Sequence, residues 1–268
     1  MISSNNKKIY YINSNKKLSG THSDFTYHID IPSDSNFDSI SVLQATIPKT
    51  YYLIEDDIGN NVFILRELGV DTSISVPQGN YNRRSFQTTI QTLLNSSSPN
   101  NWTYVVSFQS STSVQNGKFT FTVSGNSGQP SLIFQTTIAS QFGFDFNSTN
   151  TFSGNTLTGS NVINMQREDS IYIHCDACSN ETDNILQEIF SVNNADFSNL
   201  TFQNFNVEAY VKDLISNTKN IYRFWITDED GTPINLNGSN IQITLLLFER
   251  NNFFTMAKNF LKYTLLKN

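Results

Sequence analysis

Residues 174–178 come closest, by residue type and spacing, to a site of metal or redox chemistry. They read His-Cys-Asp-Ala-Cys, and a Cys-x-x-Cys pair can place two thiolates on one tetrahedral zinc ion. Such a site needs four ligands, and the rest of the chain adds no cysteine and only His22 and His28. Alternation along the expected strand places Ile173 and Cys175 on one face, which predicts a buried, inert Cys175 with Cys178 in the following turn. We therefore expect no metal and no cofactor.

Nucleophilic catalysis would require a serine or cysteine beside a base, and Cys178 with His174 is the only compact candidate. The Gly-x-Ser-x-Gly elbow of a hydrolase does not occur in the sequence. We interpret His174 as an ordinary strand residue. The sequence therefore predicts no catalytic residue and a protein that is not an enzyme.

Two glycine-containing stretches also invite a ligand-binding interpretation. Residues 228–230 cluster three carboxylates before Gly231, but the fuller Asp-x-Asp-x-Asp-Gly calcium loop with a distal glutamate is missing, which favours a solvated hairpin turn. Gly79-Asn80 lacks the second glycine and the Gly-Lys-Ser/Thr of a phosphate loop. We expect Gly79 to adopt a positive φ and Tyr81 to pack as an anchor.

The composition excludes some classes of protein. The formal net charge is −6 and the pI is near 5.0, whereas phosphate binding needs clustered Lys and Arg, so we expect no specific nucleic acid partner. Charged residues make up only 15% of the chain. The abundant Asn and Ser suit turns and covered surfaces, and are equally what an AT-rich coding sequence would give. No apolar run is long enough to cross a membrane and the start is not apolar, so we expect retention in the cytosol or nucleus.

Hydrophobic periodicity predicts a chain made mainly of strands. Phe25, Tyr27, Ile29 and Ile31 alternate with polar residues, as in a half-buried strand. Apolar spacing predicts a helix over 82–95 and a short one over 137–142. Further strands are expected at 39–47, 61–68, 103–109, 118–124, 132–135, 162–165, 170–175, 185–192, 205–211, 221–227 and 241–248.

The predicted fold class is all-β: a single jelly-roll β-sandwich with an inserted small α+β segment and a C-terminal amphipathic helix. The polar, partly basic start indicates an extended arm. A Gly/Asn/Thr/Ser stretch at 147–161 is interpreted as a linker out of the insertion. The expected parts are the N-terminal arm (1–23), the first part of the jelly roll (24–70), the inserted domain (71–160), the second part of the jelly roll (161–250) and the helical tail (251–268).

Three stretches occur in a combination typical of one protein family. Pro77–Tyr81 leads into a helix, Gln141–Phe144 follows a short helix, and Phe224–Gly238 combines a strand, an Asp/Gly turn and an Asn-Gly turn before the final strand. With the strand Ile171–Cys175, these stretches resemble the penton, or minor capsid, proteins of virophages, polinton-like viruses and related large double-stranded DNA viruses. The resemblance spans residues 70–250.

This resemblance implies a structural capsid protein, a penton subunit that forms homopentameric capsomers at the five-fold vertices of an icosahedral double-stranded DNA virus. The implied partners are further copies of itself and neighbouring major capsid protein capsomers, with other minor capsid proteins, host glycans or a spike in addition. The implied location is the virion, after synthesis in the host cytoplasm or viral factory. Five copies around an axis need heterologous contacts, so each subunit must offer two different complementary faces.

The same resemblance implies a jelly roll that stands upright in the shell. Its arm and tail then point toward the shell, and the insertion either faces outward or packs beside the jelly roll. Arg83 and Arg84 on the predicted helix, and the lysines of the tail, provide local positive charge for DNA or a membrane, although charged helix faces are mostly just solvated.

A carbohydrate-binding, host-attachment jelly roll of the virion is the alternative interpretation. In that case aromatic residues of the insertion, such as Trp102, Tyr104 and Phe152, are expected to stack on sugars. The alternative therefore depends on these rings being accessible.

Overall fold

The chain forms two compact units. Its computed structural model describes residues 7–32, 35–56, 58–108, 116–166, 170–178, 184–191, 197–215 and 220–250. Unit 1 combines Met1–Tyr51 with Glu168–Asn268, and unit 2 is the single segment Tyr52–Arg167. Unit 2 is therefore an insertion into the sequence of unit 1.

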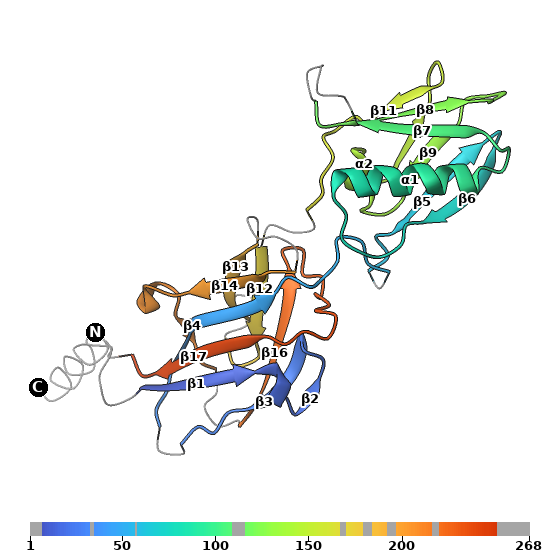
Figure 1. Cartoon of the computed structure of the whole chain (residues 1–268). Coiled ribbons are helices and arrows are strands. Elements are labelled where there is room, and N and C mark those ends of the chain that lie inside the picture. The colour runs from blue at the N-terminus through green and yellow to red at the C-terminus, as the bar shows by residue number, and fades with distance from the viewer. Residues whose placement is uncertain are drawn as a thin grey trace, which may run out of the picture. The chain divides into compact units, whose positions relative to one another are not determined.

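Unit 1 is a sandwich of two antiparallel sheets (Figure 1). Its strands are β1 (Lys7–Asn13), β2 (Ser19–Gly20), β3 (Asp24–His28), β4 (Ser39–Pro48), β12 (Ser170–Cys175), β13 (Ile185–Phe190), β14 (Asn199–Gln203), β15 (Lys212–Asp213), β16 (Ile221–Asp228) and β17 (Gln242–Phe248). The first sheet has the order β1-β17-β4-β14, with β15 also paired to β4, and the second has the order β13-β12-β16-β3-β2. Two 3-10 helices, η1 (Ser14–Lys16) and η3 (Val207–Ala209), lie between strands.

The strand order is that of a jelly roll. When the two-residue strands β2 and β15 are set aside, eight strands remain among the described residues. Numbered along the chain, they follow the order first, eighth, third, sixth in one sheet and fifth, fourth, seventh, second in the other. This interleaving of two Greek keys defines the eight-stranded jelly roll. The all-β jelly-roll sandwich expected from the sequence is confirmed, with unit 2 inserted between the third and fourth strands.

The core of unit 1 is built by side chains that alternate along its strands. In β16, Tyr222 and Phe224 are buried, whereas Ile221 and Arg223 are exposed. Phe224 lies opposite Phe25 of β3, and the two rings stack with centroids 5.7 Å apart. Burying one such side chain is worth about 1.5–3 kcal/mol, so the period of two in the sequence directly selects the face that packs inward.

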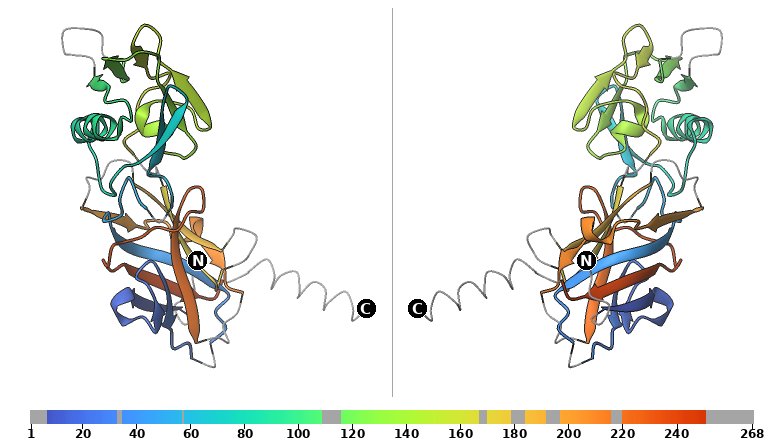
Figure 2. Two further views of the ribbon diagram at one scale, coloured as in Figure 1. Left: turned by 90° about the vertical axis from the view of Figure 1, so that its right-hand side faces the viewer. Right: turned by 90° about the vertical axis from the view of Figure 1, so that its left-hand side faces the viewer.

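Unit 2 contains two small antiparallel sheets and two helices. Its elements are β5 (Val62–Glu67), β6 (Val70–Ser75), α1 (Arg83–Ser97), β7 (Thr103–Phe108), β8 (Phe119–Ser124), β9 (Ser131–Phe134), α2 (Ala139–Phe142), β10 (Ser148–Thr151) and β11 (Thr156–Thr158). The sheet orders are β10-β9-β5-β6 and β11-β8-β7. Figure 2 looks nearly along α1 and shows this helix at one side of the strands of unit 2. Both predicted helices are therefore present.

Helix α1 begins at a capping box. The side chain of Asn82 accepts hydrogen bonds from the backbone N–H groups of Arg84 and Ser85, and the Ser85 hydroxyl accepts one from the Asn82 N–H. Such a cap satisfies backbone donors that the first helical turn leaves free. The apolar positions at helical spacing, Phe86 and Ile90 among them, are buried against the unit's core.

Residues 7–23 belong to the sandwich, which corrects the prediction of an arm over 1–23; residues 1–6 lie outside the described residues. Strand β1 pairs with β17 along its whole length, from Lys7 opposite Phe248 to Asn13 opposite Gln242. Ile12 is 2% exposed and belongs to the core. The lysines suggested a solvated arm, but an edge strand of a sheet also carries charged residues on its free side.

The predicted domain boundaries at 70 and 160 are also wrong. Residues 62–67, expected in the jelly roll, form β5 and pair with β6 and β9 of unit 2. The insertion therefore begins at Tyr52, not at residue 71, and extends to Arg167. Alternating apolar residues identify a strand but carry no information about the sheet to which it belongs.

Three shorter segments also differ from the predictions. The expected linker 147–161 contains β10 and β11, which pair with β9 and β8. These two strands, Ser-Thr-Asn-Thr and Thr-Leu-Thr, have almost no apolar residues that could have indicated them. Residues 162–165 form no strand, and 205–211 contain the 3-10 helix η3. The predicted tail helix at 251–268 lies outside the described residues.

Candidate functional site

The side chains of residues 174–178 are part of the fold of unit 1. The His174 ring stacks on Trp225 with centroids 4.9 Å apart, and its Nε2 lies 2.9 Å from the hydroxyl of Thr227. Cys175 and Cys178 are fully buried in the hydrophobic core. Burial, and then the neighbouring Cys178, raise the pKa of the Cys175 thiol well above its usual range. The prediction of a buried Cys175 is confirmed, and a protonated thiol is a poor nucleophile and metal ligand.

The acidic residues 228–230 form a hairpin turn. One carboxylate oxygen of Asp228 accepts hydrogen bonds from the N–H groups of Asp230 at 3.1 Å and Thr232 at 2.8 Å. Gly231 has a φ of +80°, which glycine adopts at little cost. In the part of the chain that the structure describes, no three His, Cys, Asp or Glu side chains are grouped so that they could hold a metal ion.

The Pro77–Tyr81 stretch connects the first residues of unit 2 to the start of helix α1 through hydrogen bonds and packing. Gly79, with a φ of +150°, exchanges two backbone hydrogen bonds with Ile54. The Tyr81 hydroxyl donates to the carbonyl of Pro77 at 2.6 Å, and its ring packs edge to face on Phe86. The predicted positive φ of Gly79 and the anchoring role of Tyr81 are confirmed.

The Asn-Gly turn of the Phe224–Gly238 stretch has a bracing role in unit 1. The side-chain amide of Asn237 donates to the carbonyl of Thr50 at 2.7 Å, and the Thr50 hydroxyl donates to the carbonyl of Leu236 at 2.7 Å. These bonds hold the last residues of unit 1 before the chain enters the insertion. This part of the Phe224–Gly238 stretch thus contributes to the architecture of unit 1.

The aromatic residues proposed to stack on sugars are buried. Trp102 is 4% exposed, Tyr104 is fully buried and Phe152 is 2% exposed, and all three belong to the core of unit 2. The prediction that these rings form a carbohydrate-binding surface is wrong, because their side chains pack in the core and are not accessible to a sugar. The Arg83 guanidinium lies over the Phe108 ring, 3.9 Å from its centroid, where it makes a cation–π contact.

An open groove lies at one edge of the unit 1 sandwich. It has a volume of about 760 Å³ and is formed between β13 and β14, the end strands of the two sheets. Phe205 is 88% exposed and Phe190 74% exposed, and Phe202 and Tyr210 pack edge to face with centroids 6.3 Å apart. We call this feature the edge groove; the lining side chains that matter below are Tyr172, Glu188, Phe190, Phe202, Phe205 and Tyr210.

The edge groove is acidic at its Tyr172 end. The Glu188 carboxylate accepts a hydrogen bond from Ser170 at 2.8 Å and lies 3.4 Å from the Tyr172 hydroxyl. Burial raises the pKa of Tyr172, and the negative charges of Glu188 and of nearby Glu229 raise it further. Lys212 is the one basic residue that lines the groove among the described residues.

A buried acceptor also lines the edge groove. The side-chain amide nitrogen of Gln187 donates to the carbonyl of Glu188 at 2.7 Å, which fixes the orientation of the amide. Its oxygen, Oε1, is buried and has no hydrogen-bond partner among the described residues. An unsatisfied buried acceptor is costly to the fold, and this one lies behind the surface of the groove.

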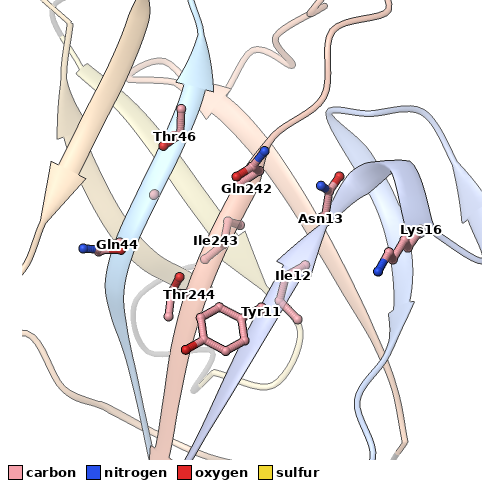
Figure 3. A pocket seen from close by; sticks show the side chains of 10 residues that line it. Tyr11, Ile12, Asn13, Lys16, Gln44, Thr46, Gln242, Ile243 and Thr244 are labelled. Carbon is pink, nitrogen blue, oxygen red and sulfur yellow. The ribbon is translucent and has the colours of Figure 1, made fainter.

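The opposite edge of the sandwich is formed by β1. Across the outer face of the first sheet, Tyr11 lies opposite Thr244 and Thr244 opposite Gln44, which gives a row of side chains over three strands. Figure 3 shows these side chains around a shallow depression of about 260 Å³, with Lys16 at its margin. Tyr11 is 75% exposed. Amides and hydroxyls dominate, so the surface can hydrogen-bond a partner but has no acid–base pair.

The sequence did not identify the rings of the edge groove. The sequence predicted a strand over 205–211, in which Phe205 would have been one of the alternating side chains of a sheet. In the structure Phe205 lies in a turn instead. The Asn204 side chain accepts a hydrogen bond from the Asn206 N–H at 2.8 Å, which closes an Asx turn. An aromatic residue between two asparagines is therefore the signal that could have revealed an exposed ring.

The chain was compared with protein families, curated proteins and solved structures. No protein-family model and no curated protein matches the chain. Among solved structures, the crystal structure of the mavirus penton protein matches with a TM-score of 0.47 and 16% identity, over 90% of this chain and 98% of that chain. The chain is thus similar to a penton protein over most of both lengths.

No helix within the described residues has the length and apolarity to cross a membrane.

Proposed function

We propose that this chain is a structural capsid protein, a penton subunit of which five copies close a ring at each vertex of an icosahedral double-stranded DNA virus. The observation that carries the proposal is the jelly-roll sandwich with exposed apolar side chains at both of its edges. The jelly roll is a fold of viral capsid domains. The penton-like stretches at 77–81, 141–144 and 224–238 support the same assignment.

A ring of identical subunits requires each subunit to present two different faces that fit each other. Unit 1 presents an aromatic groove with a carboxylate at its Tyr172 end on the β13/β14 edge, and a basic strand with Tyr11 on the β1 edge. Exposed aromatic side chains are enriched in interfaces and are uncommon as free surface. These two edges are what supports assembly through the sides of the sandwich.

The proposed partners are further copies of the chain and the neighbouring major capsid protein capsomers, with other minor capsid proteins, host glycans or a spike as additional candidates. The proposed location is the capsid vertex of the virion, after synthesis in the host cytoplasm or viral factory. We assign no catalysis to the protein. In the described part of the chain, His174 and the two cysteines are committed to packing.

Electron microscopy of the purified, negatively stained protein tests this proposal. We expect rings with five-fold symmetry, and we expect the protein in purified virions by mass spectrometry. Light scattering of the same sample gives the mass of the assembly, which should be five times 30.3 kDa. A strictly monomeric protein that is absent from particles would disprove the proposal.

A further inference from the structure

The edge groove has the surface of a docking site. Its most exposed rings, Phe205 at 88% and Phe190 at 74%, stand at a depression whose wall is the Phe202–Tyr210 pair. Aromatic side chains that stand this far into water gain most when a partner covers them. An occupant with its own apolar side chains is therefore favoured.

Polar groups in the edge groove restrict the choice of occupant. Lys212 lines the groove, whereas at the Tyr172 end the Glu188 carboxylate accepts a hydrogen bond from Ser170 and lies 3.4 Å from the Tyr172 hydroxyl. Glu229 lies close enough to raise the pKa of Tyr172. The occupant should therefore bring hydrogen-bond donors and positive charge.

The β1 edge of unit 1 carries both of these properties. It exposes apolar side chains, with Tyr11 at 75% and Ile9 at 46%. It also exposes the ammonium groups of lysines, and each ammonium is a cationic donor. The exposed lysines of this edge are Lys7, Lys8 and Lys16.

We infer that the edge groove receives the β1 edge of a second copy of this chain. Strands β1 and β14 are the two ends of one sheet, so a copy that accepts a neighbour with its groove still offers its own β1 edge to the next copy. Such a contact is heterologous and propagates until it closes into a ring. This inference rests on the proposed function, because a ring of identical subunits makes a second copy the occupant.

The inference is tested with one variant on each face. Phe205→Asp damages the groove, Tyr11→Asp damages the β1 edge, and both side chains are too exposed to support the core. Each variant alone should need about a tenfold higher concentration, or more, to assemble, as expected for an aromatic anchor of an interface. Phe146→Asp, which changes an exposed phenylalanine of unit 2, is the matched control and should assemble normally.

A mixture of the two variants separates this arrangement from others. The intact groove of Tyr11→Asp should bind the intact β1 edge of Phe205→Asp, which leaves no further free contact. Native mass spectrometry should therefore show a 1:1 heterodimer in the mixture and monomers in each separate sample. A mixture that stays monomeric would contradict the pairing of these two edges.

The remaining outcomes distinguish this inference from the proposed function. If both variants still form the same rings as the wild type, the inference is overturned and the penton assignment is not affected. If only Phe205→Asp loses assembly, the groove binds something other than the β1 edge, such as residues 251–268 or the groove of another copy. This result also overturns the inference. Wild-type assemblies that are not pentamers but give the mixed dimer support the inference and overturn the five-fold assignment. A wild type that never assembles overturns both.

Discussion

The β7 edge of unit 2 is covered by a helix, whereas, among the described residues, both ends of the first sheet of unit 1 are left uncovered by strands. In unit 2, strand β7 ends its sheet, and side chains of α1 cover it: Asn95 bonds both backbone groups of Tyr104, at 2.7 and 2.9 Å, and Gln91 and Gln87 bond those of Val106 at 3.0 and 2.7 Å. In unit 1, no further strand among the described residues pairs with β1 or β14. An uncovered edge strand can pair with another chain, so the two ends of this sheet of unit 1 can receive partners, whereas the β7 edge of unit 2 cannot.

Aromatic side chains show the same contrast. In unit 2 Phe146 is exposed, but a large cluster of rings faces inward, and Phe142 lies at its centre, 4.8 Å from Phe63, 4.9 Å from Phe134 and 5.2 Å from Phe86 between centroids. In unit 1 the rings of Tyr11, Phe190, Phe197, Phe205 and Tyr210 are exposed. Unit 2 therefore completes its own core, whereas unit 1 leaves part of its apolar surface for an assembly to cover.

The largest expected effect comes from the centre of unit 2. Phe142→Ala removes a fully buried ring that contacts several others, and truncation of such a ring costs about 3–5 kcal/mol. Urea unfolding should show this loss in the transition of unit 2. Phe146→Ala, at a 58% exposed position in the same unit, should change the free energy of unfolding by less than about 0.5 kcal/mol.

The same variant tests whether the two units are independent. If unit 1 supplies all contacts between copies, Phe142→Ala should weaken unit 2 and leave assembly unchanged in light scattering. Loss of assembly at a urea concentration where unit 1 is still folded would show instead that unit 2 contributes to the contacts between copies.

Alkaline pH should weaken both units through different tyrosines. Burial, and then Cys175, Asp176 and Tyr10, raise the pKa of Tyr222 to about 12 from its ordinary 10.0. Between these values the unfolded chain loses the proton and the folded chain keeps it, so the free energy of unfolding of unit 1 falls by about 2 kcal/mol as the pH rises. Tyr222→Phe should remove this part of the pH dependence, measured by urea unfolding at a series of pH values.

Tyr104 provides the corresponding control in unit 2. Its hydroxyl donates to the buried Glu67 at 2.8 Å, and burial together with Glu67 raises its pKa strongly. Tyr104→Phe should flatten the alkaline loss of unit 2 and not that of unit 1. If either variant flattened both transitions, the units would not unfold separately.

Uncovering the edge of β7 should have a smaller effect. Asn95→Ala removes both hydrogen bonds to Tyr104, each worth about 1 kcal/mol net, while alanine improves helix propensity by a few tenths. We expect a net loss of about 1–1.5 kcal/mol in unit 2. Thr92→Ala is the control, since its hydroxyl donates to the Thr88 carbonyl within the same helix. An equal loss in both variants would mean that the hydrogen bonds from Asn95 to β7 do not contribute to the stability of unit 2.

The sequence predicts elements well because their signals are local. Phe25, Tyr27 and Ile29 alternate along β3, and Phe86, Ile90 and Leu94 repeat at helical spacing in α1, so strand and helix follow from neighbours alone. Membership of a sheet is not local. Residues 62–67 pair with a strand nearly 70 positions later, at Ser131–Phe134, and alternation cannot indicate that partner.

The candidate surface was harder to predict for the same reason. The edge groove joins β13 to β14 and to the turn around Phe205, and its existence depends on which strands end the two sheets. Buried Cys175, by contrast, was predictable from the alternation of Ile171, Ile173 and Cys175 within one strand. Surfaces formed by ends of sheets require the topology, which sequence periodicity does not contain.

The smallest expected effect concerns an exposed contact that joins two strands of unit 1. Arg223 of β16 makes a bidentate ion pair with Asp24 of β3, at 2.8 and 2.7 Å, and its guanidinium lies 4.8 Å from the Trp225 ring centroid. Both side chains are about half exposed, at 52% and 47%, and exposed pairs of this kind are worth about 0–1 kcal/mol.

Arg223→Lys keeps the charge but loses the planar fork and its stacking on Trp225, so we expect a loss below about 1 kcal/mol in unit 1. The loss should shrink in high salt, because solvent-exposed charges are screened. Arg66→Lys, which alters the exposed pair with Asp71 in unit 2, is the matched control. A large loss in Arg223→Lys alone would show that the second sheet of unit 1 depends on this pair, and would extend the difference between the units from their edges to the pairing of their strands.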